Sequence, residues 1–255
     1  MNPVSSIKRH LVDYLLGRNS LARPAIRFCI ENGLFPGVLT RTPSSELRSL
    51  LHLPAYEHTT QLNQDVFALL INRFRPGYFL EIGANDGFTL SNTVYLEEHF
   101  QWTGALIEAN PKYAGSLRRR LQSKILNVAV ASVTGEADFV DAGLYGGLSG
   151  LMDATHADYT AGAPVISVPC LPLNAVLDEI QAPGRIDFVS IDVEGGELPI
   201  VEQMTGGSTR YRCGCIETNR RADDRKTIIR LLEASGYQAF WDGLTEQDLF
   251  FVDIA

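Results

Sequence analysis

A short apolar strand that runs directly into a glycine-rich turn limits the fold of this 255-residue chain more than any other feature. The strand is predicted over residues 78–82, and the turn reads Gly83-Ala84-Asn85-Asp86-Gly87. Apolar and amphipathic segments then alternate, which predicts helices over 90–100 and 111–122 and strands over 104–107 and 125–131. Strands separated by helices in this way pair in parallel, because each crossover helix returns the chain to the same end of the sheet.

The alternation resumes after an interruption over residues 132–170. Helices are predicted over 173–180, 197–204 and 223–235, and strands over 186–191 and 211–216. Two last strands, over 237–241 and 249–252, are joined through Asp242-Gly243, a pair typical of turns between antiparallel strands. We therefore predict an α/β fold with a doubly wound, Rossmann-like, mostly parallel seven-stranded sheet that ends in a C-terminal antiparallel hairpin.

The first 60 residues differ from the rest in pattern and in charge. Prolines break them into helical pieces, which predicts a helical N-terminal extension over 1–60 and an α/β domain over 61–255. The chain has a net charge of −8, of which residues 1–50 contribute +4, so that the remainder carries −12. An acidic domain argues against a nucleic-acid partner. The apolar N-terminal helices leave a homo-oligomer open.

The chain shows no sign of a membrane or of an oxidising compartment. No apolar run approaches the ~18 residues that a transmembrane helix needs, so we predict no transmembrane segment. The first residues include Asp13 and Tyr14, which a secretory signal would exclude. The four cysteines form no CxxC pair, so neither a disulfide framework nor a zinc site is indicated. We predict a cytoplasmic protein.

Acidic and amide residues follow five of the predicted strands, at the edge where open α/β sheets bind ligands. The first turn lacks the GxGxxG spacing, because Asn85 stands where a dinucleotide site has its second glycine. Asp86 would also repel a pyrophosphate, and the turn has no GxxxxGK[ST] pattern. An acid-flanked glycine loop instead favours a cationic ligand without phosphate, and S-adenosylmethionine (SAM) fits that description. Glu108 follows Gly87 by 21 residues, where an acid accepts hydrogen bonds from a ribose.

These segments resemble the FkbM family of SAM-dependent methyltransferases. The resemblance rests on Phe79–Gly87, Ile107–Pro111, Asn127–Val130 and the DVEGGE run over residues 192–197. It implies a class I methyltransferase domain over 61–255, in which Asp192 lies near the methionine ammonium or the acceptor. The other cofactor-binding residues that it implies are Glu81, Gly83, Ala84, Asn85, Asp86, Gly87, Glu108, Asn110, Asn127 and Ala129.

Catalysis is expected at the ends of the fourth and fifth strands of the sheet. Methyl transfer needs an acceptor oxygen behind the methyl group and a group that takes its proton. We rank Glu194 first and Glu217 second for that role, with Asp192 beside them. A magnesium ion on these three carboxylates is an alternative that we do not favour. We interpret Glu197 as a charge at a helix N-terminus and Arg118-Arg119-Arg120 as a solvent-facing helix surface.

The sequence therefore predicts a SAM-dependent O-methyltransferase. Its acceptor is expected to be a hydroxyl of a small polar molecule, either a sugar of a glycan or glycolipid or a natural product. The loop over 143–150, with Tyr145 and Ser149, is either a lid over the acceptor or an ordinary connection. His156 also belongs to the interrupting segment, and we favour surface placement over a role as base for it. The alternative function is a non-catalytic SAM-binding or scaffold protein of a polysaccharide pathway.

Overall fold

The computed structural model describes residues 60–62, 64–142, 149–151, 162–218, 222–240 and 247–255. Apart from residue 60, the predicted N-terminal extension lies outside the described residues. So do Tyr145 and His156, and the Asp242-Gly243 turn. Among the described helices, none combines the length and apolarity needed to span a bilayer.

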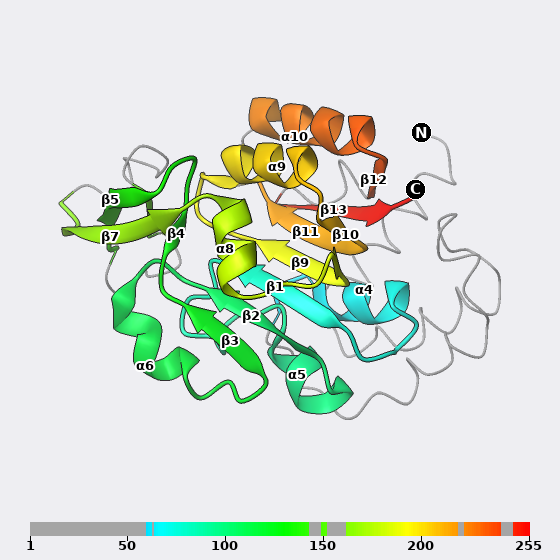
Figure 1. Ribbon diagram of the computed structural model, residues 1–255, viewed down its shortest axis with the longest axis horizontal. Coiled ribbons are helices and arrows are strands. Elements are labelled where there is room, and N and C mark those ends of the chain that lie inside the picture. Colours follow the sequence, from blue (N-terminus) through cyan, green and yellow to red (C-terminus); the bar gives the residue numbers. More distant parts are fainter. Residues whose placement is uncertain (1–59, 63, 143–148, 152–161, 219–221, 241–246) are drawn as a thin grey trace, which may run out of the picture.

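Seven strands form the central sheet, in the order β12-β13-β11-β9-β1-β2-β3 (Figure 1). These strands are β1 (Tyr78–Ile82), β2 (Thr103–Ile107), β3 (Ser123–Leu126), β9 (Phe188–Ile191), β11 (Cys213–Glu217), β12 (Tyr237–Phe240) and β13 (Asp248–Asp253). β1 pairs in parallel with both β2 and β9, whereas β13 runs antiparallel to β11 and β12. The predicted α/β class is confirmed, and the sheet is mixed.

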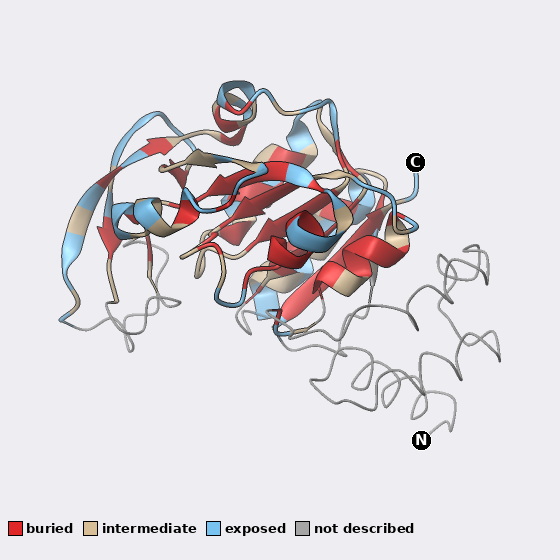
Figure 2. Ribbon diagram, turned by 90° about the horizontal axis from the view of Figure 1, so that it is seen from below, coloured by how far each residue is buried: buried red, intermediate tan, exposed pale blue. Residues whose placement is uncertain are grey.

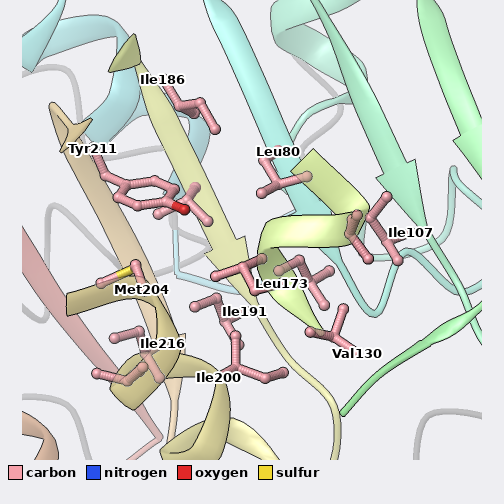
Figure 3. Close-up of a cluster of buried hydrophobic side chains, with 14 of the residues drawn as sticks. Leu80, Ile107, Val130, Leu173, Ile186, Ile191, Ile200, Met204, Tyr211 and Ile216 are labelled. Atoms are coloured by element: carbon pink, nitrogen blue, oxygen red, sulfur yellow. The ribbon is translucent and has the colours of Figure 1, made fainter. Parts of the chain in front are cut away.

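Two hydrophobic cores lie on the two faces of this sheet. Helices α8 (Leu173–Glu179), α9 (Glu197–Gly206) and α10 (Ala222–Ala234) contribute to one core, part of which Figure 3 shows. Helices α4 (Gln64–Ile71), α5 (Val94–Phe100) and α6 (Ala114–Leu117) contribute to the other. Alternate residues of a strand point to opposite faces, so Phe79 joins the second core and Leu80 the first. The central strands are accordingly buried over most of their length (Figure 2).

Four strands between Ala129 and Leu171 form a second sheet beside the first. Its strands are β4 (Ala129–Val130), β5 (Gly135–Val140), β6 (Gly150–Leu151) and β7 (Val165–Leu171), in the order β4-β7-β5-β6. The strand predicted over 125–131 is therefore divided. β3 pairs with β2, while β4 pairs in parallel with β7 and leaves the main sheet. A short pair, β8 (Arg185–Ile186) with β10 (Arg210–Tyr211), lies where β9 and β11 were predicted to begin.

Two predicted helices are shorter in the structure than in the sequence pattern. The helix expected from residue 90 begins at Val94, because the preceding segment is hydrogen-bonded to Glu81 instead. The helix expected over 111–122 is a 3-10 turn, η3 (Pro111–Tyr113), followed by the four residues of α6. The prediction that Arg120 faces solvent is wrong, because Arg120 is only 3% exposed and its guanidinium forms an ion pair with Glu97.

Candidate functional site

A pocket opens at the carboxyl ends of β1, β2, β9 and β11, where the sequence predicts the site. The predicted site residues that line it are Glu81, Gly83, Ala84, Asn85, Glu108, Ala129, Asp192, Glu194 and Glu217. Four others, Asp86, Gly87, Asn110 and Asn127, do not line it. The strand ends therefore bring together residues that lie more than 130 positions apart in the chain.

Gly83 allows the ends of β1 and β9 to approach each other closely. Its φ is +86°, and a Cβ atom at this position would lie 1.6 Å from the carbonyl oxygen of Asp192. The backbone N–H of Gly83 donates to the carbonyl of Ile107 on the neighbouring strand (2.9 Å). Only glycine fits this conformation and this space, so the first glycine of the turn is a requirement of packing as well as of the loop.

Glu108 is held at the end of β2 by two backbone amides. One oxygen accepts a hydrogen bond from the N–H of Asn85 (2.8 Å), and the other accepts one from the N–H of Asn110 (2.7 Å). The residue is only 7% exposed, and burial raises the pKa of Glu108 to about 7. Each carboxylate oxygen has a second lone pair, so this side chain retains acceptors for two ribose hydroxyls.

The four predicted residues outside the pocket wall stabilise the loops around it. Asp86 accepts hydrogen bonds from the N–H groups of Phe88 (2.8 Å) and Thr89 (2.7 Å), which shapes the turn after the glycines. The side chain of Asn110 accepts from the N–H of Lys112 (3.2 Å), and Asn127 Nδ2 donates to the carbonyl of Glu108 (3.3 Å). Gly87 has a positive φ of +81°.

Glu81, the penultimate residue of β1, lines the pocket. Three groups of residues 91–93 donate hydrogen bonds to its carboxylate. Its carboxylate accepts hydrogen bonds from the N–H of Asn92 (2.8 Å) and from the hydroxyls of Ser91 (3.0 Å) and Thr93 (2.5 Å). Burial raises the pKa of Glu81, while the charge of Arg120 and these hydrogen bonds oppose the rise. Glu81 thus holds Ser91 and Asn92, which also line the pocket, in place.

Three carboxyl groups meet beyond the ends of β9 and β11. Oxygens of Asp192, Glu194 and Glu217 all lie within 4.8 Å of one another. Burial and a hydrogen bond to Glu217 raise the pKa of Asp192, and burial also raises the pKa of Glu217 to about 7. Among the described residues, Glu217 Oε2 is buried without a hydrogen-bond partner. Burial thus favours the protonated form of these two neighbouring groups, and the raised pKa of Glu217 lies near neutral pH.

Glu194 lies in the sharp turn between β9 and α9. Its φ is +58°, a conformation that few residues other than glycine adopt, and Gly195 beside it has a φ of +114°. Glu197 stabilises this turn, because its carboxylate accepts from the N–H groups of Val193 (3.1 Å) and Gly195 (2.9 Å). The interpretation of Glu197 as a helix N-terminal charge is confirmed.

Polar residues that the sequence did not indicate also line the pocket near these carboxyl groups. Asp248 is 7% exposed and stands opposite Glu217 in the register of β11 and β13. Its carboxylate accepts a hydrogen bond from Gln64 at the start of α4 (2.8 Å). Asn92 Nδ2 donates to the hydroxyl of Ser190 on β9 (2.9 Å). These contacts join positions up to 184 residues apart, and no local pattern in the sequence signals them.

The donors present fit both groups that the sequence analysis considered. Carboxylates that offer oxygen ligands are what a magnesium ion needs, and Asp192, Glu194 and Glu217 are close enough together to hold one. Glu108, Gly83 and the backbone around Asn85 form a separate region that fits a ribose and an uncharged or cationic tail. The two regions are neighbours in one pocket.

Solved methyltransferase structures are similar to this chain. The solved methyltransferase FkbM of Methylobacillus flagellatus is 14% identical with a TM-score of 0.43; the match covers 91% of this chain and 59% of that one. An O-methyltransferase from Bacillus cereus, solved in complex with SAH, is 12% identical with a TM-score of 0.46, over 90% and 97% of the two chains. No curated protein matches. The sequence profile of the methyltransferase FkbM domain matches residues 81–239, more than half of the chain. The chain therefore belongs to the FkbM methyltransferase family.

Proposed function

We propose that this protein transfers a methyl group from SAM to a hydroxyl of a small polar acceptor, a sugar of a glycan or glycolipid or a natural product. One observation carries the proposal: a single pocket joins Glu108, the acid that we assign to the ribose, to three neighbouring carboxyl groups, Asp192, Glu194 and Glu217. Membership of a methyltransferase family implies the use of SAM. We assign the α/β domain over residues 61–255 to this activity.

The two ends of the pocket have different roles in this proposal. The cofactor end consists of Glu81, Gly83, Ala84, Asn85 and Glu108, and it binds and orients SAM. Asp86, Gly87, Asn110 and Asn127 support it from outside the pocket wall. Ala129 from β4 closes the side that we assign to the adenine. SAM, when bound, supplies a methyl group on a positively charged sulfur.

The acceptor end consists of Asp192, Glu194, Glu217 and Asp248, and its task is to orient a hydroxyl and to take its proton. The sequence ranks Glu194 before Glu217 as the base, and the geometry favours the reverse order. Glu217 has a buried oxygen without a partner and a pKa raised to about 7, which suits proton transfer at neutral pH. Glu194, in its strained turn, is then the residue that orients the hydroxyl.

Binding is the first test of this proposal. Calorimetry with SAM and with SAH is expected to show micromolar affinity. Incubation with SAM labelled on its methyl carbon and with polar glycan extracts is then expected to transfer the label to an oxygen, as mass spectrometry would show. A protein that binds neither compound contradicts the proposal. Binding without transfer to any extract favours the scaffold alternative.

The magnesium alternative is tested in the same assay. Chelation with EDTA leaves label transfer unchanged if the carboxyl pair alone accepts the proton. A loss of transfer that added magnesium restores, together with unchanged SAH affinity, assigns Asp192, Glu194 and Glu217 to a cation instead.

A further inference from the structure

The guanidinium of Arg120 lies buried behind the pocket, although the residue belongs to a run of three arginines. Its side chain is 1% exposed, whereas Arg118 and Arg119 are exposed. A buried charge is costly unless it is paired and hydrogen-bonded, so its partners indicate what this side chain does. Those partners fall into two sets: groups that fix Arg120 in the fold, and two hydroxyls that also contact Glu81.

The first set fixes Arg120 within the fold. Its Nε and Nη2 atoms each lie 3.1 Å from Glu97 Oε2, on helix α5. Its Nη1 atom donates to the carbonyl of Gly87 at the end of the glycine turn (2.7 Å). Glu97 also accepts from the hydroxyl of Ser123 on β3. Arg120 thus connects α5 with the glycine turn, and its guanidinium has a fixed orientation.

The second set consists of two hydroxyl groups that lie between Arg120 and Glu81. Arg120 donates to the hydroxyl of Ser91 (3.3 Å) and to that of Thr93 (3.1 Å). The same two hydroxyls donate in turn to the carboxylate of Glu81. A buried cation and a buried anion therefore lie on opposite sides of a pair of hydroxyls, and each hydroxyl is both acceptor and donor.

Only one side of this arrangement reaches the pocket. Glu81 lines it, together with Ser91 and its neighbours Thr89, Leu90 and Asn92, whereas Arg120 does not. We propose that Arg120 is a positioning residue for the cofactor: from behind the pocket it holds Ser91 and Thr93 against Glu81, and so keeps residues 89–92 and the Glu81 carboxylate in place. This inference rests on the proposed use of SAM.

Each hydroxyl has a single hydrogen, which it can donate in only one direction. With Arg120 donating to its oxygen, a hydroxyl directs its own hydrogen toward Glu81. Without Arg120, each hydroxyl loses a donor, although Ser91 Oγ still accepts from the N–H groups of Thr93 and Val94, and Glu81 loses the positive charge that lowers its pKa. SAM carries one more positive charge than SAH at the sulfur. Loss of the Glu81 charge should therefore weaken SAM more than SAH.

The test compares Arg120→Met, Arg120→Lys and the control Arg118→Met, with SAM and SAH titrated separately into the full-length protein. Because Arg120→Met leaves Glu97 buried and unpaired, the double variant Arg120→Met/Glu97→Gln removes both charges and protects the fold. Melting temperatures show which variants are folded. We expect the double variant to bind SAM about tenfold more weakly, as for the loss of charge-assisted hydrogen bonds. The preference for SAM over SAH should fall about threefold, and Arg120→Lys should retain it.

The outcomes separate this inference from the proposed function. Wild-type protein that binds neither SAM nor SAH contradicts the proposed function itself. Wild-type protein that binds both, with a folded double variant of unchanged SAM affinity or unchanged preference for SAM, overturns the role of Arg120 alone. Arg118→Met is expected to stay within about twofold of wild type for both compounds, because its side chain faces solvent.

Discussion

The cofactor end and the acceptor end of the pocket both contain carboxyl groups, but the hydrogen-bond partners of these groups differ. At the cofactor end, both oxygens of Glu108 and of Glu81 accept hydrogen bonds from the protein itself. At the acceptor end, Asp192, Glu194 and Glu217 lie close together, and Glu217 Oε2 has no hydrogen-bond partner among the described residues. Carboxylates that accept several hydrogen bonds from the protein keep their position, whereas a buried carboxyl oxygen without a partner is available to a ligand. The difference indicates a rigid binding region beside a reactive one.

The largest effect should come from the acceptor end. Glu217→Gln removes the proposed base and is expected to lower methyl transfer by about 10²–10⁴-fold, the usual contribution of general-base catalysis. SAH affinity should change by less than about threefold, because Glu217 lies away from the cofactor end. Label transfer and calorimetry on the same preparation measure both values. Equal losses of methyl transfer and of SAH affinity would contradict the separate roles of the two ends.

At the cofactor end, Gly83→Ala should remove SAH binding. The new Cβ would lie 1.6 Å from the Asp192 carbonyl oxygen, so the ends of β1 and β9 must separate. We expect an affinity loss of about a hundredfold or more and a lower melting temperature. Gly135→Ala is the matched control, because a Cβ there has no atom within 4 Å and the φ is not positive. Normal SAH binding by Gly83→Ala would contradict the assigned position of the cofactor.

Glu108→Ala should weaken SAH binding to an intermediate degree. The substitution removes the ribose acceptor and leaves the N–H groups of Asn85 and Asn110 without their partner. A loss of about 10–100-fold is expected for charged hydrogen bonds to a ligand. The exposed Glu98→Ala serves as control in the same titration. A result within twofold of wild type would place the ribose elsewhere.

The smallest expected effect is on how the stability of the protein depends on pH. Folding raises the pKa of Glu108 and of Glu217 from 4.5 to about 7, so between these values the folded protein retains protons that the unfolded chain releases. Stability of the ligand-free protein should therefore fall as pH rises from 4.5 to 7. Glu217→Gln should flatten this decline and raise the melting temperature at pH 7 by about 2–4 °C. An unchanged or steeper decline would mean that Glu217 is already ionised in the fold.

Much of the fold could be predicted from the chain because its signals are local. Alternating apolar residues in β1 and β2 assign each side chain to one of two cores, and the glycine turn marks the strand end. Predictions failed where a distant partner competes with the local pattern. Residues 91–93 bond to Glu81 rather than extend α5, and the strand predicted over 125–131 divides because β4 pairs with β7. Arg120 is the clearest case, since nothing in a run of three arginines distinguishes the buried one.

The sequence by itself determined the fold class, the family and the positions of the acids that follow the strands, because each depends on short motifs and on periodicity. Tertiary structure alone decided the states of those acids. Glu108 meets backbone amides, Asp192 meets Glu217, and Asp248 and Gln64 come to the same pocket from opposite ends of the domain. Hydrogen-bond partners and burial set the protonation of a carboxyl group, and both arise only when distant segments pack together.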